Sequence, residues 1–208
     1  MDQFNSEEEQ IEAIKKFWKE NGIPIIFGAV LGLGGLWGWR FYSEQQLISQ
    51  EKASDAYNTA MEQLARNDGD VTPVTSFIEA NQDSAYSVMA ALQLAKEAVE
   101  RKDLAEAEKQ LIWASDNVDD ASLKDLSLVR LARVQSELNK LEEAKTTLDK
   151  VVSESFKAQV YSVKGDVLVK QEQYAAAQES YTKALELTEG NQSLLQMKID
   201  HLNSKVSS

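Results

Sequence analysis

The sequence has 208 residues and a formal net charge of -12, from 22 Lys and Arg against 34 Asp and Glu, and it contains no cysteine. An acidic surface repels nucleic acid, so we expect no nucleic-acid partner, and the lack of thiols excludes zinc ribbons, CxxC redox motifs and cysteine nucleophiles. With two prolines in a chain rich in Ala, Leu, Glu, Lys and Gln, the sequence predicts an all-α protein.

The first 22 residues predict an amphipathic tail. Ser6 and Glu9 have the spacing of a helix-capping box, and the apolar side chains from Ile11 to Trp18 recur at helical spacing. We expect residues 1–22 to form a short helix at a membrane surface, on the cytoplasmic side. Lys15, Lys16 and Lys19 favour that side, because positive charge is retained in the cytoplasm.

Residues 23–42 predict a transmembrane helix. The stretch from Ile23 to Trp39 carries no charge, and aromatic residues gather at both of its ends, as in helices anchored at headgroup depth. A cleaved signal peptide is the alternative. The bulky residues from Trp37 to Arg40 disfavour it, because signal peptidase needs small side chains at its cleavage site.

Glycines recur inside this span, and two pairs of them have the four-residue spacing that lets membrane helices approach closely. Two interpretations stay open: glycine is common in membrane helices, or these residues pack against a helix partner in the bilayer. The residues are Gly28, Gly32, Gly34, Gly35 and Gly38.

Residues 43–80 predict a connecting helix and a degenerate first repeat. A helical pattern runs from Ser43 to Arg66, residues 67–70 give a turn signal, and Pro73 marks the start of a short helix that ends near Ala80. From Ser43 onward the chain holds 18 Lys and Arg against 28 Asp and Glu, so we expect an acidic soluble domain.

Residues 81–208 predict tetratricopeptide-like repeats, the second part of the fold class that we infer: one membrane helix followed by an α-solenoid. In the stretch from 158 to 187, Gly165 and Ala177 are small enough for two antiparallel helices to cross closely, and Tyr161, Tyr174 and Tyr181 fill the surrounding space. A weaker form of this pattern occurs 33 residues earlier and again 37 residues before that. The alternative is an unspecific helical bundle.

In such a stack the first helix of each pair lines a concave face, which is where proteins are commonly bound. We expect Met89, Leu92, Leu126 and Val129 to form an exposed apolar patch there. The alternative is that the first helical pair covers this face. The predicted binding residues are Met89, Leu92, Lys96, Val99, Leu126, Val129, Arg133, Ser162, Asp166 and Val169.

No pattern in the sequence indicates catalysis. The single histidine, His201, has no cysteine, HExxH motif or serine elbow near it, and the glycine-rich stretch lies inside the span, where it cannot bind phosphate. Acidic pairs such as Asp119 and Asp120 lack the ligand spacing of a calcium loop. We therefore expect no catalytic residue, no metal and no cofactor.

The sequence resembles the YfgM family, described as an ancillary subunit of the bacterial SecYEG translocon. The resemblance lies in residues 10–22, in the segment GWRFY at 38–42, in residues 51–64 and in the repeats that follow. It implies a single-pass type II protein of the inner membrane with its repeats in the periplasm. It also implies association with SecYEG and the membrane-anchored chaperone PpiD, and a role in passing translocated proteins to periplasmic chaperones.

Two other functions fit the same architecture. In one, the protein is a membrane-bound regulator whose cytoplasmic tail, residues 1–22, sequesters a signalling protein. In the other, it is a tetratricopeptide coordinator of envelope assembly that differs from the first interpretation only in its partners.

Overall fold

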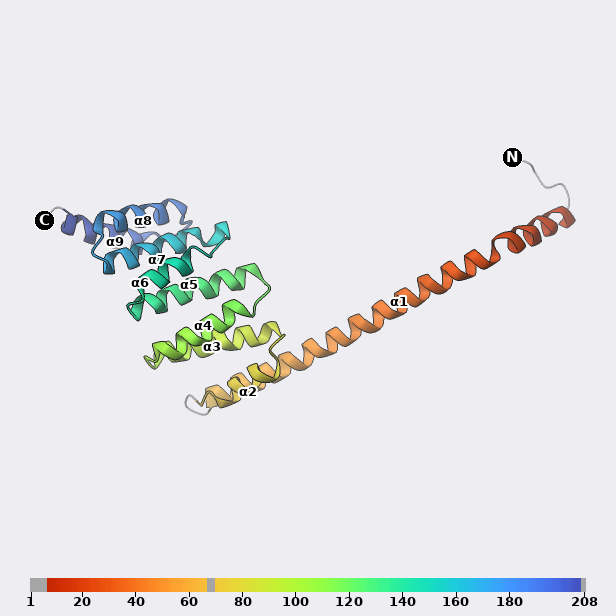
Figure 1. The fold of residues 1–208 in the computed structure, drawn as a ribbon, viewed down its shortest axis with the longest axis horizontal. Coiled ribbons are helices and arrows are strands. Elements are labelled where there is room, and N and C mark those ends of the chain that lie inside the picture. The colour runs from red at the N-terminus through yellow and green to blue at the C-terminus, as the bar shows by residue number, and fades with distance from the viewer. Residues whose placement is uncertain (1–6, 67–69, 207–208) are drawn as a thin grey trace. The chain divides into compact units, whose positions relative to one another are not determined.

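The structure, a computed structural model, describes residues 7–66 and 70–206, and every regular element in them is a helix (Figure 1). The all-α prediction is thus confirmed. The chain divides after Lys52 into two units, which are described separately. The elements are α1 Glu7–Arg66, α2 Thr72–Ala80, α3 Ala85–Glu100, α4 Leu104–Asp116, α5 Ala121–Glu137, α6 Leu141–Leu148, the short 3-10 helix η1 Glu154–Phe156, α7 Lys157–Lys170, α8 Tyr174–Leu187 and α9 Ser193–Val206.

Helix α1 is continuous over 60 residues. The sequence predicted a separate short helix before the span, and this is wrong, because the helix continues through Pro24 without interruption. Proline removes one backbone donor, and membrane-spanning helices tolerate this loss when nearby groups satisfy the freed carbonyl. Asn21 Nδ2 donates to Phe17 O at 3.1 Å in the turn before Pro24. The predicted Ser6 cap and the turn at 67–69 lie outside the described residues.

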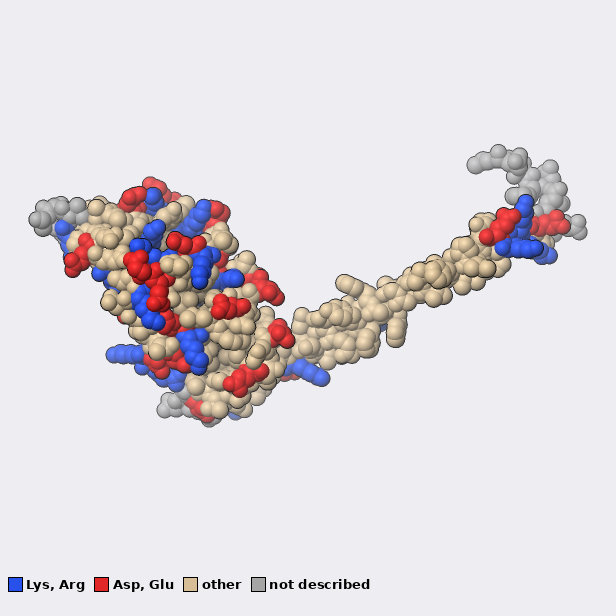
Figure 2. Space-filling view, in the orientation of Figure 1, with Lys and Arg blue, Asp and Glu red and all other residues tan. Residues whose placement is uncertain are grey.

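The middle of α1 exposes its apolar side chains. Those between Ile23 and Tyr42 are 43–82% exposed, and the most apolar window of the helix has a mean hydropathy of 1.5 with 6% of its residues buried. In Figure 2 this stretch is largely free of charge, whereas acidic and basic side chains cover the repeat domain. A core helix of a soluble protein would be mostly buried, so α1 has the length, composition and exposure of a membrane-spanning helix.

The second unit is a series of helix pairs: α3 packs on α4, α5 on α6 and α7 on α8, and α9 covers α8 (Figure 1). Its first core cluster joins the end of α1 and α2 to the α3–α4 pair, through residues such as Leu64, Phe77 and Leu111. Two further clusters centre on α5 to α7 and on α7 to α9. The short helix predicted to start near Pro73 is confirmed as α2.

The same turn connects the two helices of each pair. Its central residue, Lys102, Asn139 or Glu172, has a φ near +60°. The next residue donates its backbone N–H back to a carbonyl five residues earlier, which is the Schellman arrangement that ends a helix. These bonds run from Asp103 N to Ala98 O at 2.8 Å, from Lys140 N to Gln135 O at 2.8 Å and from Gln173 N to Leu168 O at 2.9 Å.

Gly165 lets α7 and α8 approach closely. A Cβ at this position would lie under 3.0 Å from three ring atoms of Tyr181. That ring is 3% exposed, and its hydroxyl donates to Asp166 Oδ1 at 2.6 Å, so it has no room to move. The predicted close crossing at Gly165 is therefore confirmed.

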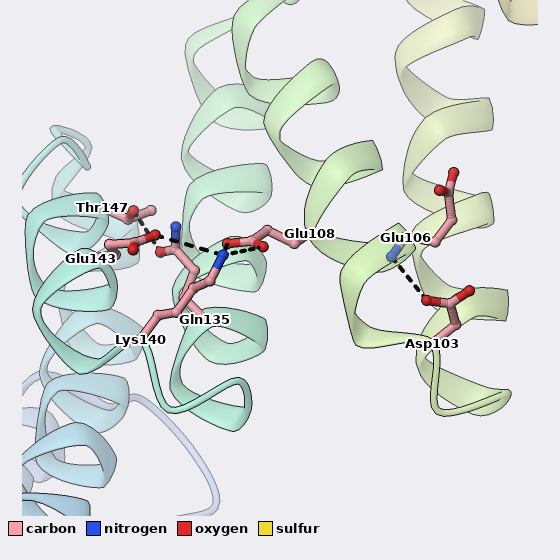
Figure 3. A network of polar contacts seen from close by, with 7 residues as sticks. All are labelled: Asp103, Glu106, Glu108, Gln135, Lys140, Glu143 and Thr147. Atoms are coloured by element: carbon pink, nitrogen blue, oxygen red, sulfur yellow. Dashed lines mark hydrogen bonds and ion pairs between the residues drawn. The ribbon is translucent and has the colours of Figure 1, made fainter.

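Polar contacts tie helices together both within a pair and between neighbouring pairs. Lys140 in the α5–α6 turn lies 2.7 Å from Glu108 Oε2 on α4, and Thr147 Oγ1 on α6 donates to Gln135 Oε1 on α5 at 2.7 Å (Figure 3). The Glu108 carboxylate raises the pKa of Lys140. Buried Asp125 accepts from Ser153 N at 2.8 Å, which fixes the loop between α6 and α7.

We expect Gly165→Ala to lower the free energy of unfolding of the full chain by about 2 kcal/mol, because the added methyl group overlaps the fixed Tyr181 ring. Urea unfolding in detergent, followed by far-UV circular dichroism, measures this change. The control is Gly28→Ala, where an added Cβ meets no atom within 4 Å. Equal stability of the two variants would contradict the tight crossing.

Glu172→Gly is expected to raise the free energy of unfolding by roughly 0.5–1 kcal/mol, because glycine removes the steric cost of the left-handed conformation. Asn139→Gly is the comparator. Asparagine tolerates this conformation, so its replacement should change stability less. The two variants are compared by the same urea titration, and a larger gain at Asn139 would refute the argument.

Candidate protein-binding site

The first helices of the pairs line a groove of about 780 Å³, which we call the A-helix groove. Helices α3 and α5 form most of it, and the rest comes mainly from α4, Tyr57 of α1 and Asp166 of α7. Two features bring these side chains together. The turns fold the two helices of each pair back on each other, and the small residues let those two helices approach closely. The first helices α3 and α5 then line one groove.

Most of the residues predicted from sequence to bind protein line this groove. They are Met89, Leu92, Lys96, Val99, Leu126, Arg133 and Asp166. Positions 126, 129 and 133 of α5 are equivalent in the repeat to positions 89, 92 and 96 of α3, 37 residues earlier. The repeat spacing therefore predicted most of the residues that line the groove.

The apolar floor of the groove is open in part. Met89 and Val99 are each 43% exposed and Leu126 is half-buried. The end of α1 contributes Tyr57 to the lining, but it does not cover these side chains. Leu92, at 7% exposure, is buried in the core under the groove, so its prediction as an exposed residue is wrong.

Three other predicted residues do not line the groove. Val129 was expected on the open face, and this is wrong: it is 1% exposed and packs with Ala144 and Val163 between α5, α6 and α7. Ser162 and Val169 are half-buried on α7, and Val169 packs against the core of the α7–α9 cluster. Of the three residues predicted on α7, only Asp166 reaches the groove lining.

Arg130 takes the place that Val129 was expected to fill. It lies four residues after Leu126 and three before Arg133, on the same face of α5, and it is exposed at the groove. The helical spacing from Leu126 could have identified it, since a four-residue step keeps a side chain on one face more closely than a three-residue step does.

Asp166 is held within the domain. Its carboxylate accepts from the Tyr181 hydroxyl at 2.6 Å and lies 2.5 Å from Lys198 Nζ on α9. Lys198 also lies over the Tyr181 ring, 5.2 Å from its centroid. Burial raises the pKa of the Tyr181 hydroxyl, and the hydrogen bond to Asp166 adds to this rise. The phenol therefore stays protonated and acts as a structural donor.

The glycines of the span face open space on this chain. A Cβ built at any of them meets no atom within 4 Å. Gly28, Gly32 and Gly35 follow at intervals of four and three residues, so they share one face of α1, while Gly34 and Gly38 lie on an adjacent one.

We find no arrangement for metal binding in the described part of the chain: no group of three or more His, Asp or Glu side chains there could hold an ion. His201 lies exposed on α9, away from the A-helix groove.

Comparison with known proteins agrees with this architecture. A family model described as a tetratricopeptide repeat-like domain matches residues 15–204. Ancillary SecYEG translocon subunits from Haemophilus influenzae and Escherichia coli are 34% and 31% identical to this chain, over 94% and 98% of it and 97% and 100% of their own lengths. One from Neisseria gonorrhoeae is 28% identical over 94% of the chain and 97% of its own length. This chain therefore belongs to the tetratricopeptide repeat-like family of ancillary SecYEG translocon subunits.

Proposed function

We propose that this protein is a non-enzymatic adaptor of the bacterial inner membrane, an ancillary subunit of the SecYEG translocon that helps to pass translocated proteins to periplasmic chaperones. The observation that carries the proposal is the nearly full-length similarity to proteins of that name. An exposed apolar helix and a repeat groove are the two surfaces that such an adaptor requires, one for the membrane and one for a protein.

The proposed orientation puts residues 1–22 in the cytoplasm and the repeat domain in the periplasm. Lys15, Lys16 and Lys19 precede the span, whereas Arg40 and Lys52 follow it within the flanks that determine topology. The acidic repeat domain carries little information about orientation, because acidic residues contribute little to this rule.

Single-cysteine labelling tests the orientation, since the natural chain contains no cysteine. We expect a membrane-impermeant maleimide added to intact spheroplasts to label Asp119→Cys and to leave Lys16→Cys unlabelled until the membrane is permeabilised. Both positions are exposed. Labelling of Lys16→Cys in intact spheroplasts would reverse the proposed topology.

In the bilayer, we propose that the glycine face of α1 docks a membrane helix of the translocon or of PpiD. Association of membrane helices depends on close backbone approach, which Gly28, Gly32 and Gly35 allow. No described part of this chain covers these glycines, so their face is accessible to a second helix. The A-helix groove is the surface that we propose for a client protein or a periplasmic chaperone.

Photo-crosslinking in living cells tests this docking. A crosslinking residue at Leu31 or Leu36, which flank the glycine face, is expected to capture a subunit of the translocon or PpiD, identified by mass spectrometry. Adding Gly28→Leu and Gly32→Leu should reduce the captured amount about tenfold, because the larger side chains keep the backbones apart. Leucine favours a helix more than glycine does, so the loss could not result from unfolding of α1.

The matched control adds bulk to the opposite face of α1 with Val30→Phe and Leu33→Phe. These changes should leave the crosslinks unaltered. If capture persists in the leucine variant, or if crosslinkers at both flanking positions capture neither a translocon subunit nor PpiD, the docking role of α1 is refuted.

A further inference from the structure

The charged residues of the A-helix groove fall into two groups. Those of the first group have partners within the chain: Lys96 lies 3.6 Å from Glu100, and Glu137 lies 3.0 Å from Lys170. Asp166 is held by Tyr181 and Lys198, as described above. The charges of this first group are therefore largely neutralised by their partners, and they contribute little attraction to a ligand.

The second group consists of Arg130 and Arg133. Both are exposed at the groove, and neither forms a hydrogen bond or ion pair with any residue in the described ranges 7–66 and 70–206. This holds although acidic residues outnumber basic ones from Ser43 onward, 28 to 18. Two neighbouring guanidinium groups thus remain available on one face of α5.

These arginines lie beside apolar surface. Leu126 precedes Arg130 by one helical turn, and the exposed side chains of Met89 and Val99 lie across the groove on α3. Because α3 lines the groove from Met89 to Glu100, the groove runs for about 17 Å. A peptide of about five extended residues covers that length.

We propose that the A-helix groove binds a segment of a client protein in which apolar side chains adjoin one or two Asp or Glu residues. The guanidinium group of arginine matches a carboxylate with two parallel hydrogen bonds, and the floor accepts the neighbouring apolar side chains. This proposal rests on the proposed adaptor function and adds the chemistry of the segment that is recognised.

The distribution of charge favours binding of a short segment with one or two carboxylates over binding of a long polyanion. A nucleic acid would extend beyond the two arginines over the acidic surface of the domain and be repelled by it. A single carboxylate interacts mainly within the Debye length of about 8 Å at physiological salt, and Arg130 and Arg133 line the groove without a partner among the described residues.

The test uses the full chain in phosphatidylcholine nanodiscs and an array of overlapping peptides of about twelve residues from secreted proteins, long enough to exceed the groove. The native chain should bind peptides that combine apolar residues with Asp or Glu. Arg130→Glu with Arg133→Glu should weaken binding of these peptides about tenfold and favour peptides carrying Lys or Arg instead.

The matched control is Lys124→Glu with Lys150→Glu. It makes the same change in net charge at exposed residues that do not line the groove, and it should retain the native pattern. Circular dichroism checks that all three proteins have the same helix content. Glutamine versions of the best peptides should bind about tenfold more weakly than the glutamate versions.

Two results would overturn the proposal in different ways. If glutamine and glutamate peptides bind equally, or if the charge-reversed variant keeps the native pattern, the groove binds clients without reading their carboxylates and the adaptor function stands. If the native chain binds no peptide on the array, the groove is not a client site, which also counts against the adaptor function.

Discussion

The close crossing of two helices over residues with little or no side chain is the constraint on which the repeat domain depends. Ala107, Ala132, Ala144 and Ala177 are fully buried, and Gly165 allows an approach that even a methyl group would block. When backbones lie this close, the large apolar side chains must pack to the sides of the crossing. Each pair then has an inner face and an outer face, and the inner faces of successive first helices form the groove.

The chain combines two surfaces that need different solvents. The exposed apolar side chains from 23 to 42 find no protein partner along α1, so hydrocarbon is the environment that satisfies them. The repeat domain carries most of the charge of the chain and needs water. The single helix α1 contains both the apolar span and, at its end, Ala60 and Leu64 of the first core cluster.

Local signals in the sequence predicted the fold well. Small residues act through contacts within one helix pair, and the close crossing predicted at Gly165 is present between α7 and α8. The continuity of α1 was missed, because the amphipathic tail and the apolar span were treated as two separate elements. Val129 was misplaced because its burial depends on contacts with α6 and α7, which the helical spacing of α5 alone does not reveal.

In the adaptor function that we propose, the A-helix groove would hold its partner briefly. Met89 and Val99 on its floor are each less than half exposed, so a bound segment would bury little apolar area on them and the gain over the cost of association would be small. A membrane anchor would compensate for this, because it would keep the groove near client segments that emerge at the same membrane and raise their effective concentration. Weak contacts then suffice for capture, and the same weakness permits release. A deeper, drier groove would bind more tightly and would slow any transfer to a second protein.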